Sequence, residues 1–87
     1  MKRGDLATSL GRWYGKDGTP AKIVRKAQAK WGSDQMSKWM NVHQGDKLLV
    51  LGDPQFVEGY SFHPVYNPKT RETLWFPTDR LTLSAET

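Results

Sequence analysis

The chain has 87 residues, enough for one domain but not for a second core, and its ten aromatic residues, four of them tryptophan, bring apolar area to that core. It has no cysteine, which excludes a disulfide framework, a thiol nucleophile and a zinc site built on thiolates. The longest apolar run, residues 48–51, is too short for a signal peptide or a membrane span, so we expect a cytoplasmic protein with no membrane partner.

The formal net charge of +4 is unevenly spread along the chain. Residues 1–47 hold ten Lys and Arg against four Asp and Glu, whereas residues 48–87 hold three against five. The basic character therefore belongs to the N-terminal half. Such an asymmetry favours an acidic partner, either nucleic acid or the surface of an acidic protein.

Two Gly-Asp turns each precede a predicted strand. The turn at residues 4–5 leads into a strand at 5–9, and the turn at 45–46 leads into a strand at 47–51. Glycine permits a positive φ and aspartate bonds to the backbone nearby, so both residues favour turns. A Gly-Asp-Pro sequence at 52–54 should end the second strand.

A helix is predicted between these strands, over residues 20–31. Thr19 is a suitable N-cap, Pro20 occupies the first helical position, and Gly32 stands just past the end. The apolar residues fall on one side of this helix: Ile23, Val24, Ala27 and Trp31. The basic residues fall on the other side: Lys22, Arg25, Lys26 and Lys30. The residues at both ends and the helical period of the apolar residues all predict the same helix.

Residues 33–43 allow two interpretations. Asp34 can cap a short helix with Met36, Trp39 and Met40 on one face, whereas the alternation over residues 40–43 is also typical of a strand. We favour a short helix that unwinds before residue 43.

The C-terminal part is predicted to be antiparallel β structure. Residues 60–66 and 73–76 form a hairpin around a turn at 67–70, and residues 77–80 make a tight turn with one turn of 3₁₀ helix before a last strand at 81–83. Pro64 within the first of these strands favours a sheet edge or a bulge. Short strands at close spacing indicate a small barrel or a strongly bent sheet.

Three features together suggest a family. A Gly-Asp turn opens the first strand, a hairpin crosses residues 67–71, and the sequence Trp-Phe-Pro-Thr-Asp-Arg-Leu at 75–81 leads through a tight turn into a short last strand. This layout resembles SH3-like small barrels, particularly the short barrel proteins common among bacteriophage early gene products. The resemblance covers residues 1–9 and 45–84. It implies an α+β, mainly β, single domain over residues 1–87 with a helical insert at 19–43.

The same resemblance bears on function. Signalling SH3 domains bind proline-rich peptides with an acidic loop and paired aromatics, but residues 10–20 contain only Asp17 as an acid, so that pattern is absent. A phage early protein would act in the bacterial cytoplasm during host takeover. The opening residues 2–5 also resemble the start of MazF-type toxin ribonucleases, although no arginine with a partner threonine or serine can be assigned to catalysis.

Other signs of catalysis are sparse. His43 and His63 lie far apart and belong to no metal or triad motif. The carboxylates are dispersed, and the glycines at 11, 15 and 18 lack the Gly-Lys-Ser/Thr ending of a phosphate-binding loop. We therefore expect a binding protein rather than an enzyme, with no catalytic residues, metal, cofactor or small-molecule substrate.

The basic side of the predicted helix is the candidate site. Lys22, Lys26 and Lys30 recur every four residues and form one ridge with Arg25 alongside. Three neighbouring cations can extend it: Arg12, Lys16 and Lys38. Like charges four residues apart repel by a few tenths of a kcal/mol, about 0.2–0.5, and no acid within the helix offsets this repulsion. An external anion can offset it; the alternative is a solvated polar face.

The aromatic residues separate three hypotheses. The first is nucleic-acid binding, with Trp13 and Tyr14 stacking on unpaired bases; alternatively these rings belong to the core and the barrel mouth. The second is a phage-type interaction module that modulates a host protein such as a polymerase or nuclease, anchored by the cluster at residues 36–40 that includes Trp39, unless that cluster is core. The third is a MazF-like ribonuclease.

Overall fold

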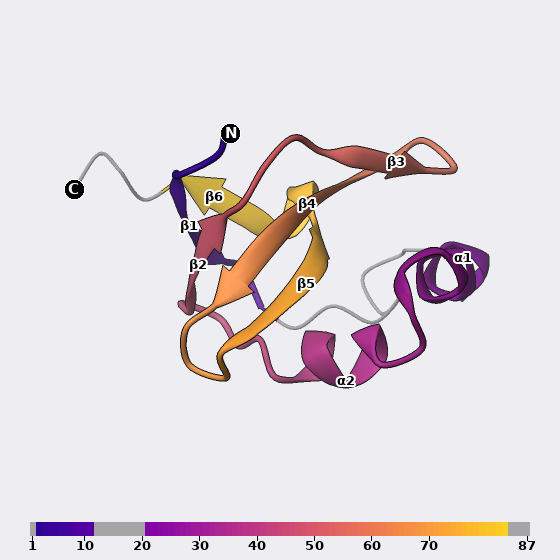
Figure 1. Cartoon of the computed structure of the whole chain (residues 1–87), viewed down its shortest axis with the longest axis horizontal. Coiled ribbons are helices and arrows are strands. Elements are labelled where there is room, and N and C mark those ends of the chain that lie inside the picture. The colour runs from indigo at the N-terminus through magenta and orange to yellow at the C-terminus, as the bar shows by residue number, and fades with distance from the viewer. Residues whose placement is uncertain (1, 12–20, 84–87) are drawn as a thin grey trace.

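A six-stranded antiparallel sheet is the frame of this computed structural model, which describes residues 2–11 and 21–83 (Figure 1). The elements in chain order are β1 (Leu6–Ser9), α1 (Ala21–Trp31), α2 (Gln35–Met40), β2 (Lys47–Val50), β3 (Gln55–Val57), β4 (Tyr60–Asn67), β5 (Glu72–Pro77), the 3₁₀ turn η1 (Thr78–Arg80) and β6 (Leu81–Leu83). The fold is α+β and mainly β, which confirms the prediction. The described strands form a twisted open sheet and do not close into a barrel.

Strand β4 organises the sheet because it pairs with three others. One of its edges pairs with β3 over residues 60–62 and then with β2 at Val65 and Tyr66, while its other edge pairs with β5 over residues 62–67. Beyond β2 come β1 and then β6. The first and last strands of the chain therefore lie side by side, at the end of the sheet opposite to β5.

Pro64 lies inside this central strand, so the prediction of a sheet edge or bulge is wrong. The missing N–H of proline is tolerated because Pro64 lies between two pairings on the same edge: β2 pairs as far as Val65, and β3 begins at Phe62. The Pro64 carbonyl still accepts a bond of 2.8 Å from the Leu51 N–H. The β2–β4 register places Leu51 opposite Pro64, so the single bond that proline leaves out falls where β4 changes partner.

Strand β3 is the element that the sequence analysis missed. A two-residue turn, Glu58-Gly59, joins it to β4, and both residues have positive φ, 51° and 85°. Such angles are typical of a type I′ hairpin turn. Glu-Gly is a weaker signal than Asn-Gly, and only Val57 of the three strand residues is buried, so no apolar alternation marks the strand.

The hydrophobic core occupies both faces of the sheet. The inner face is formed by residues that alternate along the strands: Ala7, Leu48, Val50, Val65, Leu74, Phe76 and Leu81. Phe62 and Val57 point to the opposite face, where α1 covers the β3–β4 hairpin with the buried side chains of Ile23, Val24 and Ala27. Figure 1 shows α1 beside this hairpin and α2 beside β5.

Helix α2 covers the outer edge of β5 by hydrogen bonds from its side chains. The Trp75 N–H donates to Gln35 Oε1 (3.1 Å), Trp39 Nε1 donates to the Trp75 carbonyl (2.6 Å), and Lys38 Nζ donates to the Thr73 carbonyl (3.0 Å). An edge strand needs such partners for its backbone groups. Side chains of α2 thus supply the hydrogen bonds that a neighbouring strand supplies elsewhere in the sheet.

The remaining predicted elements are confirmed with small shifts at their ends. Helix α1 begins at Ala21 and ends before Gly32, whose φ is 115°, and α2 is the short helix favoured over a strand, ending at Met40. Both helices of the described residues are too short and too polar to cross a membrane. The first, second and last strands and the 3₁₀ turn also lie within one or two residues of their predicted positions.

Candidate nucleic-acid interface

The basic ridge predicted from the sequence lies on α1 and is called the α1 ridge below. Ile23, Val24 and Ala27 are buried against the sheet and set the rotation of the helix about its axis. This rotation leaves the four cations of the ridge exposed to solvent: Lys22, Arg25, Lys26 and Lys30. Lys30 also lies in the last turn, where the helix dipole stabilises a positive charge. The described part of α1 therefore presents four cations to solvent.

Among residues 2–11 and 21–83, the ridge has one acidic partner, which comes from outside the helix and was not expected from the sequence. Glu58, at the tip of the β3–β4 hairpin, forms an ion pair with Lys26. The hydrogen bond from Lys26 and its charge, together with the charge of Lys22, lower the pKa of the Glu58 carboxyl. Helical periodicity could not reveal this pair because its members are 32 residues apart.

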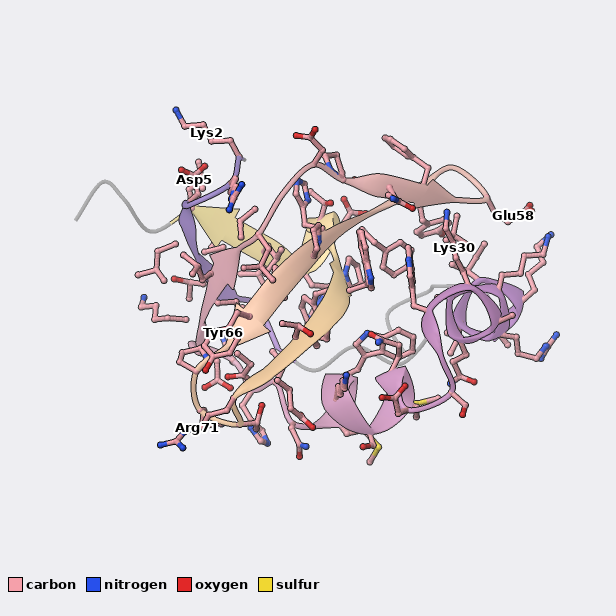
Figure 2. The ribbon with its side chains drawn as sticks, viewed as in Figure 1. Lys2, Asp5, Lys30, Glu58, Tyr66 and Arg71 are labelled. Atoms are coloured by element: carbon pink, nitrogen blue, oxygen red, sulfur yellow. The ribbon has the colours of Figure 1, made fainter. Side chains whose placement is uncertain are left out.

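Trp31 joins the end of the ridge to the sheet. Its ring stacks on Trp75 with centroids 4.6 Å apart and an interplanar angle of 9°, and it meets Phe62 at 5.1 Å in a tilted arrangement. Lys30 Nζ lies 5.4 Å from the Trp31 ring centroid, within cation–π range. Figure 2 shows the Lys30 and Glu58 side chains on the side of α1 that faces the β3–β4 hairpin.

Lys38 does not belong to the ridge. It lies on α2, where its ammonium group donates to the Thr73 carbonyl and is 3.4 Å from Asp34 Oδ2. Its side chain is 19% exposed. Two of its three donors are therefore directed at groups of the protein itself.

Trp39 lies in the core, which is the alternative to a contact role that the sequence left open. Its side chain is 0% exposed and its Nε1 is bonded to the backbone of β5. Of the two methionines grouped with it, Met36 is half-buried and Met40 is exposed. The expected aromatic and methionine anchor is thus divided between core and surface. The other four candidate residues lie outside the described ranges: Arg12, Trp13, Tyr14 and Lys16.

An open hollow of about 420 Å³ lies beside the ridge, and the sequence analysis missed it. Its lining comes from α1, α2, strands β4 and β5 and the residue after β2: Trp31, Gln35, Lys38, Leu51, Pro64, Thr73, Leu74 and Trp75. Pro64 and Trp75 are register partners, so strand alternation places them on one face. The pairing of Pro64 with Trp75 could have indicated the hollow. It could not be predicted because the sequence does not define the register of the hairpin residue by residue.

A second charged cluster lies near the turn between α2 and β2. Asp46 Oδ2 accepts the His43 N–H at 2.9 Å and lies 3.0 Å from Lys69 Nζ. Desolvation raises the pKa of Asp46, but the His43 N–H and the Lys69 ammonium group outweigh it, and the pKa of this carboxyl is lowered. This cluster ties the segment before β2 to the turn between β4 and β5.

The two histidines occupy different environments. His63 is buried and its Nδ1 lies 2.7 Å from Thr78 Oγ1, which in turn lies 2.7 Å from Ser61 Oγ. His43 is exposed beside Asp46. Within the described part of the chain, no group of three or more His, Asp or Glu side chains is placed to hold a metal ion.

Comparison with protein-family models, with curated proteins and with solved structures found no match.

Proposed function

We propose that this protein binds nucleic acid through the α1 ridge and does so without catalysis. The observation that carries the proposal is the exposure of four cations on one side of a helix whose other side is buried in the core, with Glu58 as their acidic partner among the described residues. Clustered Lys and Arg on one helix face are the electrostatic signature of proteins that bind phosphates.

The dimensions of the ridge suit a phosphate backbone. At about 1.5 Å per residue, Lys22 to Lys30 span about 12 Å along the helix. One strand of a duplex carries about three or four phosphates over that length. Long lysine side chains can adjust to small differences in spacing. An extended polyanion fits such a row of charges better than a single carboxylate does.

The test is the salt dependence of binding, measured by fluorescence anisotropy with a labelled duplex and a labelled single strand. The triple variant K22Q/K26Q/K30Q keeps good helix formers and removes three charges. If all three lysines contact phosphates, the slope of log K against log salt should fall by about 2 to 3 units. Affinity at low salt should fall with it.

A matched control removes three exposed cations elsewhere, in the variant K2Q/R3Q/R71Q. Figure 2 shows Lys2 and Arg71 on the far side of the sheet from α1. This control should keep most of the wild-type slope. Equal losses of slope in both variants would show that binding depends on total charge and not on the ridge. Cleavage of an RNA probe by the wild type would contradict a purely binding role. No binding at low salt, together with a protein partner that survives nuclease digestion, would replace the proposal with the protein-binding alternative.

A further inference from the structure

The hollow beside the α1 ridge has an aromatic wall. The parallel rings of Trp31 and Trp75 form one part of it, and the Pro64 ring, opposite Trp75 in the β4–β5 register, adds to it. Both tryptophans are only half-buried, unlike Trp39. Flat aromatic surface left partly open to solvent is the usual platform for an unpaired base.

Polar groups surround this wall. Gln35 Oε1 is used by the Trp75 N–H, so the group that this amide has left to offer a ligand is its NH₂ donor. Lys38 contributes an ammonium group and Thr73 a hydroxyl group. The hollow thus combines stacking surface with donors suited to base carbonyls and phosphates. Its volume of about 420 Å³ lies within the range of ordinary small-ligand sites.

Trp31 connects the hollow with the ridge. It is the last residue of α1, it lines the hollow, and the Lys30 ammonium group lies over its ring. Lys26 lies four residues before Lys30, about one helical turn away. A nucleotide chain that leaves the hollow therefore meets the cations of the ridge in succession.

We propose that this hollow holds one unstacked base of a single-stranded nucleic acid whose neighbouring phosphates lie on the α1 ridge. The inference rests on the proposed function and names its ligand class. A base within a duplex is stacked on both sides, and removing it costs a few kcal/mol, whereas a single strand presents its bases at little cost. The protein should accordingly prefer single strands to duplexes of the same sequence.

The test compares a single-stranded oligonucleotide with its own duplex at one salt concentration, in wild type and in two matched variants. T73E places a carboxylate at the hollow, on an exposed strand position of β5. T82E makes the same change at an exposed position of β6, at the opposite end of the sheet. Base–aromatic stacking is worth about tenfold or more in affinity, so T73E should weaken single-strand binding at least tenfold relative to T82E. Duplex binding should respond equally to both.

A second measurement does not depend on these variants. Single strands should quench the tryptophan fluorescence of the wild type more than duplexes do, and W75F should reduce that difference while circular dichroism confirms its fold. Equal affinity for single strand and duplex, with T73E and T82E alike, would overturn the inference and leave the proposed function standing. Loss of all nucleic-acid binding would overturn both. A mononucleotide that competes as well as the oligonucleotide would also overturn it, because the ridge would then have no part in binding.

Discussion

At the tip of the β3–β4 hairpin, Glu58 holds one of the four ridge cations and so competes with any phosphate for Lys26. The variant E58Q frees that lysine. We expect tighter binding of nucleic acid at low salt and a salt slope steeper by about one unit, because one more cation is available.

The control for this variant is E72Q, which makes the same change of charge beside the turn between β4 and β5. It should leave the slope unchanged. If E58Q and E72Q have the same effect on anisotropy titrations, Lys26 is not a phosphate contact. Thermal unfolding should differ little between the two, since Lys26 and Glu58 are both well exposed.

Asp46 makes the stability of the fold depend on pH. Its pKa in the folded protein is lowered, so the unfolded chain takes up the proton first as the pH falls. The contribution of this carboxylate is fully present above the ordinary aspartate pKa and is lost as the pH falls through the lowered value, from about pH 4 downward. Urea unfolding between pH 7 and pH 2 should show this loss.

The variant D46N should flatten that part of the profile, because asparagine still accepts the His43 N–H but does not titrate. D79N, at an exposed position of η1, serves as the comparison. A profile that D46N leaves as steep as the wild type would assign the acid sensitivity to other carboxylates.

At the scale of elements, α2 has few residues but contributes to the core and to the edge of β5. W39F removes the donor to the Trp75 carbonyl and leaves space in a fully buried position. The lost hydrogen bond and the cavity together should lower the free energy of unfolding by about 2–4 kcal/mol.

Two other variants of α2 provide smaller expected losses of unfolding free energy for comparison with W39F. K38M keeps an apolar stem and removes a partly exposed donor, so we expect a loss below about 1 kcal/mol. M40A changes an exposed side chain and should cost about 0.5 kcal/mol or less. Urea titrations that rank W39F with M40A would show that the contact with β5 is unimportant for stability.

At the scale of the whole molecule, local signals predicted nearly all elements, and non-local contacts decided the rest. The lysines of α1 could be assigned to one face because helical period and end signals depend on neighbouring residues. The pairing of Lys26 with Glu58 and the bond from Trp39 to Trp75 join residues 32 and 36 positions apart. The sequence therefore left Trp39 open between contact and core, and the hollow was missed.

Strand β3 shows the same limit in another form. Its turn lacks a strong dipeptide signal, and its side chains are mostly exposed, so only the pairing with β4 defines it. Pro64 was misjudged for a related reason. A proline is costly in a ladder that continues past it, and the change of partner along β4 is visible only once the register is known.

The covering of β5 by α2 has a consequence for how the chain can be shortened. The stretch between β1 and β2 contains both helices and joins two strands that pair directly, so a shortened chain could be designed without it. A truncated chain without it would carry a bare strand edge, which is a template for pairing with other copies of itself and for aggregation. Helix α2 thus covers a strand edge that would otherwise be open to pairing with another copy of the chain.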